Sequence, residues 1–297
     1  MVQTITAVIP AKNEEKNITR CIKSLDFCDR VIVIWMGNDK TGEIAKKLGA
    51  EVIKKNFSKK DDFRAVQKNI NWVIDNCNTD WILRVDADEV VSDGLKNEII
   101  FLLTKVGGNE KKVGVTSEVT LREADGRYEV PSLAVEKGSR VTESTFFRYK
   151  EIVAFGIPRK PFFLGAFLKG GDWAYDRLVR LFRPQFARYD PIVEVHELFK
   201  VKGEIGYLKN SILHYSHPDL KTIFRKFNSY TDVQIKEIND SLHLALLKML
   251  VLPAYIFLRW TIWHLGIRDS WRGILAGLLR SWYEFILYKK YILKNFF

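Results

Sequence analysis

Three carboxylates follow a short apolar run in this chain: Asp86, Asp88 and Glu89. In an extended chain, residues two apart point to the same face, so Asp86 and Asp88 would be presented together. Two carboxylates at the carboxyl end of a strand can hold a divalent cation through hard oxygen ligands, and that edge is where ligands bind in open α/β sheets. The alternative is a solvated turn before a helix that Ser92 or Asp93 caps.

The elements around these carboxylates alternate between strands and helices. Strands are expected at residues 4–10, 30–35, 50–54 and 81–85, and helices at 17–25, 41–48, 63–74 and 95–105. This alternation predicts βαβ units, and hence an α/β fold with a mostly parallel sheet and helices on both faces. Beyond residue 113 the pattern is mixed, with further strand candidates at 113–121, 141–148 and 177–183.

The chain becomes helical and apolar from about residue 220. Its longest charge-free stretch there, Met249–Leu258, is shorter than the roughly 20 residues that a membrane span requires. Aromatic residues between 271 and 286 fall on one helical face with lysines and arginines beside them, a composition typical of interfacial anchors. We therefore expect amphipathic C-terminal helices on a membrane surface, the alternative being that this face packs on the rest of the chain or on another subunit.

Charge and cysteine content restrict the partners and the compartment. The 297 residues carry a net charge of +11 with a pI of about 9.4, which favours anionic partners such as an anionic membrane surface or phosphorylated substrates. Three cysteines without a Cys-x-x-Cys pair fit a reducing cytoplasm. The N-terminus has no signal-peptide pattern, so we expect a cytoplasmic protein, peripheral on the inner face of the cytoplasmic membrane.

Ordered motifs give the chain a resemblance to family 2 glycosyltransferases, which have the GT-A fold. The segments that carry it are Thr6–Glu15, Asp39–Thr41, Phe63–Asn69 and the DxD-like Asp86–Glu89. Further motifs resemble a subgroup, the lipopolysaccharide core enzymes of the heptose β-1,4-glucosyltransferase type: Gly170–Trp173, Arg180–Arg183, Val195–Glu197 and Leu213–Ser216. The resemblance implies a GT-A domain at 1–218, with a nucleotide-sugar half at 1–110 and an acceptor half at 111–218, followed by a helical, membrane-interfacial tail at 219–297.

The same resemblance implies an inverting transfer of a sugar from a nucleotide-sugar to a hydroxyl of a cell-envelope glycan, namely a glycolipid or oligosaccharide. Mg2+ or Mn2+ on the pyrophosphate would stabilise the leaving group. The metal-ligand candidates are Asp88, Asp86 and His214. The general-base candidate is Glu197, with Asp176 and Asp172 as alternatives.

The resemblance also implies a set of substrate-binding residues. The loop after the first strand would lie against the nucleoside, and two helix residues would line the donor side. Arg180 would pair with phosphate or form a structural ion pair, and Glu89 would support the metal or cap the next helix. The set comprises Pro10, Ala11, Lys12, Asn13, Glu14, Asp39, Gln67, Asn69, Asp86, Arg180 and His196.

One departure from the family pattern concerns the nucleotide. The acidic residue that the family usually carries after its second strand is replaced by Trp35-Met36-Gly37, and the next carboxylate is Asp39. Trp35 would then stack on a base or be buried. Two other functions stay open: a polyprenyl-phosphate glycosyltransferase, and a non-enzymatic membrane- or anion-binding protein. Nucleic acid is not an expected partner, because the acidic cluster would repel phosphate in the absence of a metal.

Overall fold

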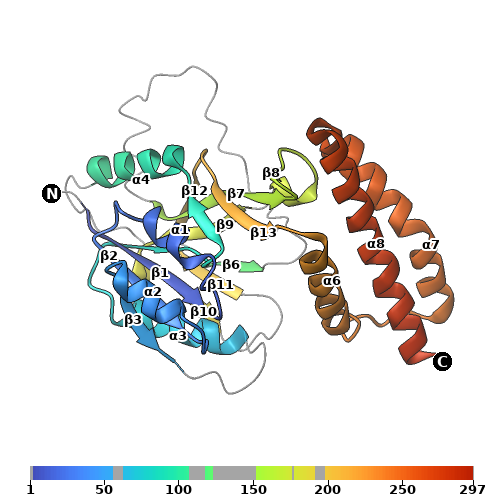
Figure 1. Cartoon of the computed structure of the whole chain (residues 1–297), viewed down its shortest axis with the longest axis horizontal. Helices are drawn as coiled ribbons and strands as arrows, with labels where there is room; N and C mark the ends of the chain where they lie inside the picture. The colour runs from blue at the N-terminus through green and yellow to red at the C-terminus, as the bar shows by residue number, and fades with distance from the viewer. Residues whose placement is uncertain are drawn as a thin grey trace. The chain divides into compact units, whose positions relative to one another are not determined.

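The computed structural model describes residues 3–55, 63–106, 118–122, 152–175, 177–190 and 198–296. The chain divides into two compact units, which are described separately (Figure 1). Unit 1 comprises Met1–Arg159 and Arg177–Leu213, and unit 2 comprises Lys160–Asp176 and His214–Phe297.

Unit 1 is built on a parallel sheet. Its strands are β1 (Ile5–Ala11), β2 (Arg30–Trp35), β3 (Glu51–Lys54) and β4 (Trp81–Arg84), in the spatial order β3-β2-β1-β4. The helices are α1 (Ile18–Lys23), α2 (Thr41–Lys47), α3 (Phe63–Asp75) and α4 (Asp93–Val106). Because β-α-β connections return each strand in the same direction, the carboxyl ends of β1, β2 and β4 meet at one edge of the sheet.

Antiparallel strands extend this sheet beyond β4. They are β9 (Arg177–Phe182), which pairs with β4, and β7 (Ile152–Phe163), which pairs with β9. The sheet continues through β13 (Ile212–His217) and β5 (Glu89–Val91), and β12 (Glu204–Tyr207) lies parallel to β7. A separate three-stranded sheet has the order β10 (Ala187–Asp190), β11 (Leu198–Lys202) and β6 (Glu118–Arg122), with the 3-10 turn η2 (Pro184–Phe186) before it.

The central strand β1 alternates between two hydrophobic cores, as its period of two requires. Ile5, Ala7 and Ile9 face the core that α1, α2 and α4 cover. Val8 faces the opposite core, which α3 covers together with β10 and β11. Helices therefore pack on both faces of the sheet, and the α/β fold class predicted from the sequence is confirmed.

Unit 2 is a hairpin loop with a group of helices. Strand β8 (Ala166–Phe167) pairs with the end of β7, and the 3-10 turn η1 (Asp172–Tyr175) follows. The helices are α6 (Leu220–Gln234), α7 (Leu242–Leu258), a π-helical turn η3 (Arg259–Trp263), η4 (Gly266–Asp269) and α8 (Ser270–Asn295). Helices α7 and α8 lie side by side (Figure 1).

A buried tryptophan organises this helical group. Trp260 is fully buried among Phe163, Leu168, Ile223 and Ala276, and its indole nitrogen donates to the Gly273 carbonyl at 2.8 Å. A Cβ on Gly277 would lie 2.7 Å from the indole ring, so only glycine leaves room for it at this position.

Some local expectations require correction or lie outside the described residues. The residue before α1 is Asn17, and the Asn13 side chain accepts a hydrogen bond from the Asn38 amide. The strand expected at 141–148 lies outside the described residues. The helix that begins at Leu242 continues to Trp263 and, with a mean hydropathy of 1.6, is long and apolar enough to cross a membrane, although the sequence predicted no span.

Candidate functional site

The acidic segment after β4 forms a tight turn. Strand β4 ends at Arg84, and the Glu89 amide donates to the Asp86 carbonyl at 2.9 Å. The Glu89 carboxylate in turn accepts from the Asp86 amide at 2.9 Å. The expectation that Asp86 and Asp88 share one face of an extended strand is therefore wrong, because the chain has already turned. Ser92 caps α4 through its hydroxyl, which accepts from the Leu95 amide.

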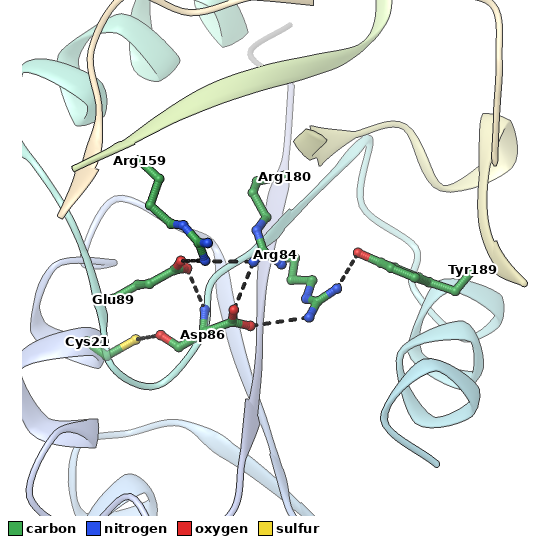
Figure 2. A network of polar contacts seen from close by, with 7 residues as sticks. All are labelled: Cys21, Arg84, Asp86, Glu89, Arg159, Arg180 and Tyr189. Atoms are coloured by element: carbon green, nitrogen blue, oxygen red, sulfur yellow. Dashed lines mark hydrogen bonds and ion pairs between the residues drawn. The ribbon is translucent and has the colours of Figure 1, made fainter. Parts of the chain in front are cut away.

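Two buried arginines neutralise Asp86. Nη2 of Arg180, on β9, lies 2.8 Å from one carboxylate oxygen of Asp86, and Nη2 of Arg84, at the end of β4, lies 3.4 Å from the other (Figure 2). Arg84 also donates to the Tyr189 hydroxyl at 2.7 Å. Since both arginine side chains are 5% exposed, the charge of Asp86 is held in a low-dielectric environment by direct partners.

Glu89 is the fully buried carboxylate of the network. Nη1 of Arg159, from β7, lies 3.4 Å from it, and Nη2 of Arg180 lies 3.9 Å from it. With Arg84 and Asp86, the network holds three arginines and two carboxylates (Figure 2). Asp88 lies in the same turn, so the three arginines are balanced by three carboxylates at the carboxyl edge of the parallel strands.

Two pKa shifts reflect this network. Burial and Arg84 lower the pKa of the Arg180 guanidinium, but Asp86 and Glu89 raise it more, so the pKa lies above its ordinary value. Burial, followed by the negative charges of Glu89, Asp86 and Asp88, raises the pKa of the Cys21 thiol well above its ordinary value. The protonated thiol donates to the Asp86 carbonyl at 3.5 Å, so Cys21 supports the turn and is not a nucleophile.

The loops after β1 and β2 are joined through Asp39. Its carboxylate accepts from the Thr41 hydroxyl at 2.8 Å, the Thr41 amide at 3.2 Å and the Glu15 amide at 3.1 Å. The Thr41 hydroxyl also accepts from the Glu14 amide at 2.9 Å. Burial raises the pKa of Asp39, but these hydrogen bonds lower it more, so the pKa lies below its ordinary value.

The same loops meet at Gly37, where a Cβ would lie 2.5 Å from Oδ1 of Asn13. The chain from Pro10 to Glu14, which the sequence assigns to the nucleoside, is thus held against the loop after β2. These contacts pre-organise a rim at the carboxyl edge of the sheet.

Trp35 fills the position where the sequence departs from the family pattern. Nζ of Lys54 lies 3.3 Å from the centre of its ring, and a Cβ on Gly42 would lie 2.4 Å from ring atom Cε3. The tryptophan is therefore packed between protein groups, with a cation–π contact as one of them. Trp35 is half-buried there, so both expectations, stacking on a base and burial, stay predictions.

Helix α3 presents three amide side chains. Asn71 donates to the Tyr189 carbonyl at 2.8 Å and accepts from its amide at 3.0 Å, which joins α3 to β10. Asn69 contacts the Met36 sulfur at 3.8 Å. Gln67, one turn before Asn71, is 0% exposed, and among the residues that the structure describes neither its Oε1 nor its Nε2 has a hydrogen-bond partner. A buried amide without a partner costs stability, which marks Gln67 as a functional candidate.

The metal-ligand candidates are placed differently. Asp88 is partly buried in the turn, whereas Asp86 is engaged by two arginines. Among the residues that the structure describes, no group of three or more His, Cys, Asp and Glu side chains gathers to hold a metal. A single carboxylate still fits Mg2+ or Mn2+, since such ions are commonly held by one or two carboxylates together with substrate phosphates. His214 lies on β13 in unit 2 and stays a prediction.

The base candidates are only partly described. Glu197, Asp176 and His196 lie outside the described residues, and their roles stay predictions. Asp172 is engaged in unit 2 by Arg259 and by Nδ1 of His264, which lies 2.6 Å from its carboxylate. Its part in this cluster is to hold η1 against η3.

Sequence reasoning missed Arg84, Arg159 and Tyr189. Arg84 did carry a signal, because an arginine inside an apolar strand requires a buried acidic partner. Arg159 and Tyr189 carried none, since their contacts depend on how distant strands pair.

Comparison with known proteins finds similarity in the N-terminal part of the chain. Residues 6–107 match the family model described as Glycosyl transferase family 2. An uncharacterized glycosyltransferase of Rickettsia bellii is 36% identical over 104 residues, which cover 34% of this chain and 33% of that protein. The segment from residue 6 to residue 107, which contains the Asp86–Glu89 turn, is therefore similar to the family 2 glycosyl transferases.

Longer matches are more distant. An uncharacterized glycosyltransferase of Rickettsia conorii is 25% identical over 80% of this chain and 71% of its own length. The lipopolysaccharide core biosynthesis glycosyltransferase LpsC of Rhizobium meliloti is 20% identical over 98% of this chain and 94% of its own length. Among solved structures, S. aureus TarS 1–349 is 12% identical over 99% of this chain and 93% of its own, with a TM-score of 0.39.

Proposed function

We propose that the chain is an inverting glycosyltransferase that moves a sugar from a nucleoside-diphosphate sugar to a hydroxyl of a cell-envelope glycan. The observation that carries the proposal is the Asp86–Glu89 turn, which lies within the family-matched segment and at the carboxyl end of a parallel strand. Ligands of open α/β sheets bind at that edge. The name of the LpsC relative supports an acceptor in the lipopolysaccharide core or a similar glycolipid.

In this proposal some of the described residues neutralise charge and others position the substrate. Asp88 would hold Mg2+ or Mn2+, which supplies neutralisation of the leaving diphosphate. The three arginines around Asp86 and Glu89 keep the turn in place. The joined loops at Asn13 and Asp39 would form the nucleoside side, and Gln67 would pair its buried amide with the donor.

The acceptor side is proposed from the sequence. Glu197 would accept the proton of the acceptor hydroxyl, with Asp176 as the alternative base. His196 and Arg180 would bind a phosphate group of the substrate. The protein would act in the cytoplasm, peripheral on the inner face of the membrane, where its substrates meet.

The test is a transfer assay with purified protein, Mn2+, a panel of nucleoside-diphosphate sugars and lipopolysaccharide core acceptors. Release of one nucleoside diphosphate that depends on both acceptor and metal is expected, with a loss of at least about 100-fold in Asp88→Asn. Asp93→Asn, at the start of α4, is the matched control and should retain activity. Absence of transfer with every donor, or full activity in Asp88→Asn, would refute the proposal.

A further inference from the structure

The connection between α7 and α8 exposes large apolar side chains. We call residues 262–271 the hairpin tip. Within it, Trp263 is 79% exposed, Ile262 65%, Ile267 61% and Trp271 53%. Monomeric soluble proteins seldom expose a contiguous apolar patch of more than a few hundred Å², so this concentration indicates a surface that something covers.

Apolar stripes continue from the tip along both helices. The exposed apolar residues recur at intervals of one to four positions on α7 and of three or four positions on α8. The two stripes are Leu244, Leu247, Leu250, Val251, Tyr255 and Leu258 on α7, and Trp271, Ile274, Leu278 and Trp282 on α8. The opposite side of α7, with Ala245 and Ile256, is already buried within unit 2. The exposed stripes are thus surplus to the packing of the unit.

The charge of residues 242–297 indicates which kind of partner covers the apolar surface. Residues 242–297 contain eight lysines and arginines against two acidic residues, which complements an anionic surface. The guanidinium of Arg272 lies 4.5 Å from the Trp271 ring, and Arg268 is exposed between the apolar residues of the tip. Tryptophan with adjacent arginine is the composition of side chains that sit at the headgroup level of a bilayer.

The length of the charge-free segment decides between lying on a bilayer and crossing it. Lys248 pairs with Asp240 at 2.7 Å, and Arg259 pairs with Asp172. The ten residues between Lys248 and Arg259 rise only about 15 Å as a helix, half of the roughly 30 Å of a hydrocarbon core. Both ion pairs would lie in hydrocarbon if α7 crossed the membrane, so the hairpin fits the interface.

The tip is also tied to the loop before η1. The amides of Lys169 and Gly170 donate to the Asp269 carboxylate at 2.9 and 2.8 Å, and the Gly171 amide donates to the His264 carbonyl at 2.8 Å. A Cβ on Gly170 would lie 2.3 Å from the Leu265 carbonyl oxygen. With the Asp172 ion pairs, these contacts fix the loop to the tip as one body.

We propose that the α7–α8 hairpin lies in the interface of an anionic bilayer, with the tip inserted, and so holds the Gly170–Asp172 loop at the lipid surface. The occupant of the apolar surface is lipid. Docking of this surface on lipid does not depend on the enzymatic activity. What it means for the reaction rests on the proposed function: the acceptor is an amphiphile whose saccharide headgroup the enzyme reaches at the membrane.

Vesicle sedimentation tests the tip directly. The double variant Ile262→Gln/Trp263→Gln changes two side chains that are mostly in solvent, so folding is preserved. With vesicles of 70% phosphatidylcholine and 30% phosphatidylglycerol, we expect its partition coefficient to fall at least about tenfold, or about 1.4 kcal/mol. The matched control is Trp72→Gln/Ile100→Gln in unit 1, which removes the same residue types at exposed positions and should bind like the unaltered protein.

Each other outcome overturns a specific part of the inference. Absence of vesicle binding, or equal binding by the tip variant, refutes the docking surface. A dimer that the tip variant dissociates, measured by sedimentation velocity, would make the surface a subunit interface. Retention in vesicles after carbonate washing would show a spanning helix.

Activity separates this inference from the proposed function. If the unaltered protein transfers sugar, the tip variant should lose turnover on an acceptor in vesicles and keep its turnover on a water-soluble core oligosaccharide. Equal loss on both acceptors would refute the link between the tip and the acceptor. Vesicle binding without any transfer would refute the proposed function and leave the docking surface standing.

Discussion

The buried ion network around the acidic turn makes a sharp prediction for Arg180→Met. Methionine keeps much of the side-chain volume but removes the 2.8 Å pair with Asp86 and the 3.9 Å approach to Glu89. At 2.8 Å the pair attraction is about 6 kcal/mol with an effective dielectric constant of 20. Part of this is offset because the arginine no longer needs desolvation, so we expect a loss of about 3–5 kcal/mol in the free energy of unfolding.

Arg188→Met is the matched control. Arg188 also pairs with a carboxylate, Asp75, but both side chains are half-exposed, so its loss should cost less than about 1 kcal/mol. Urea unfolding followed by circular dichroism measures both variants, with unchanged m-values required for the comparison. The reasoning is refuted if Arg180→Met lies within 1 kcal/mol of the unaltered protein, or if the two variants cost the same.

Three further outcomes are expected. The pKa of Asp39 is lowered in the folded state, so the stability that its carboxylate contributes is present above the unfolded-state pKa and is lost as the pH falls through the folded-state pKa. Between pH 6 and pH 3, the midpoint of thermal unfolding should therefore fall less in Asp39→Asn than in the unaltered protein. Parallel curves of midpoint against pH for the two proteins would contradict this. Gln67→Leu should raise the free energy of unfolding by about 1 kcal/mol, because none of the described residues pairs with the amide. The variant should also bind nucleotide more weakly, and a stable variant with full affinity would exclude Gln67 from the donor site. At pH 8, a thiol reagent should modify Cys77 before Cys21 and Cys28, because burial raises the pKa of the Cys21 and Cys28 thiols and the thiolate is the reactive form. Equal modification rates for the three cysteines in the native protein would contradict the burial argument.

The sequence was a good guide to unit 1, because its strands and helices are set by local periodicity. Strand β2 was predicted with its observed bounds, Arg30–Trp35, since an apolar run bounded by polar turns leaves little alternative. The position of the acidic residues at the carboxyl edge of the sheet followed from the same pattern.

The site was less predictable, because its partners come from distant segments. Arg180 and Arg159 reach the turn only through the antiparallel pairing of β9 and β7, which no local pattern encodes. The turn at Asp86–Glu89 is itself closed by the Glu89 side chain, so an acidic residue that reads as a solvent-exposed group is fully buried. The helical segment Leu242–Trp263 contains two cations, Lys248 and Arg259, that the sequence counted as interruptions and that pair with Asp240 and Asp172.

The measurement that tests the central claim most directly is calorimetric titration of the purified protein with a panel of nucleoside diphosphates, with and without Mn2+. The account predicts that one nucleoside diphosphate binds, that binding requires Mn2+, and that Asp88→Asn loses it while Asp93→Asn does not. Binding of none, or binding that is indifferent to both Mn2+ and Asp88, would contradict a nucleotide-sugar site at the acidic turn.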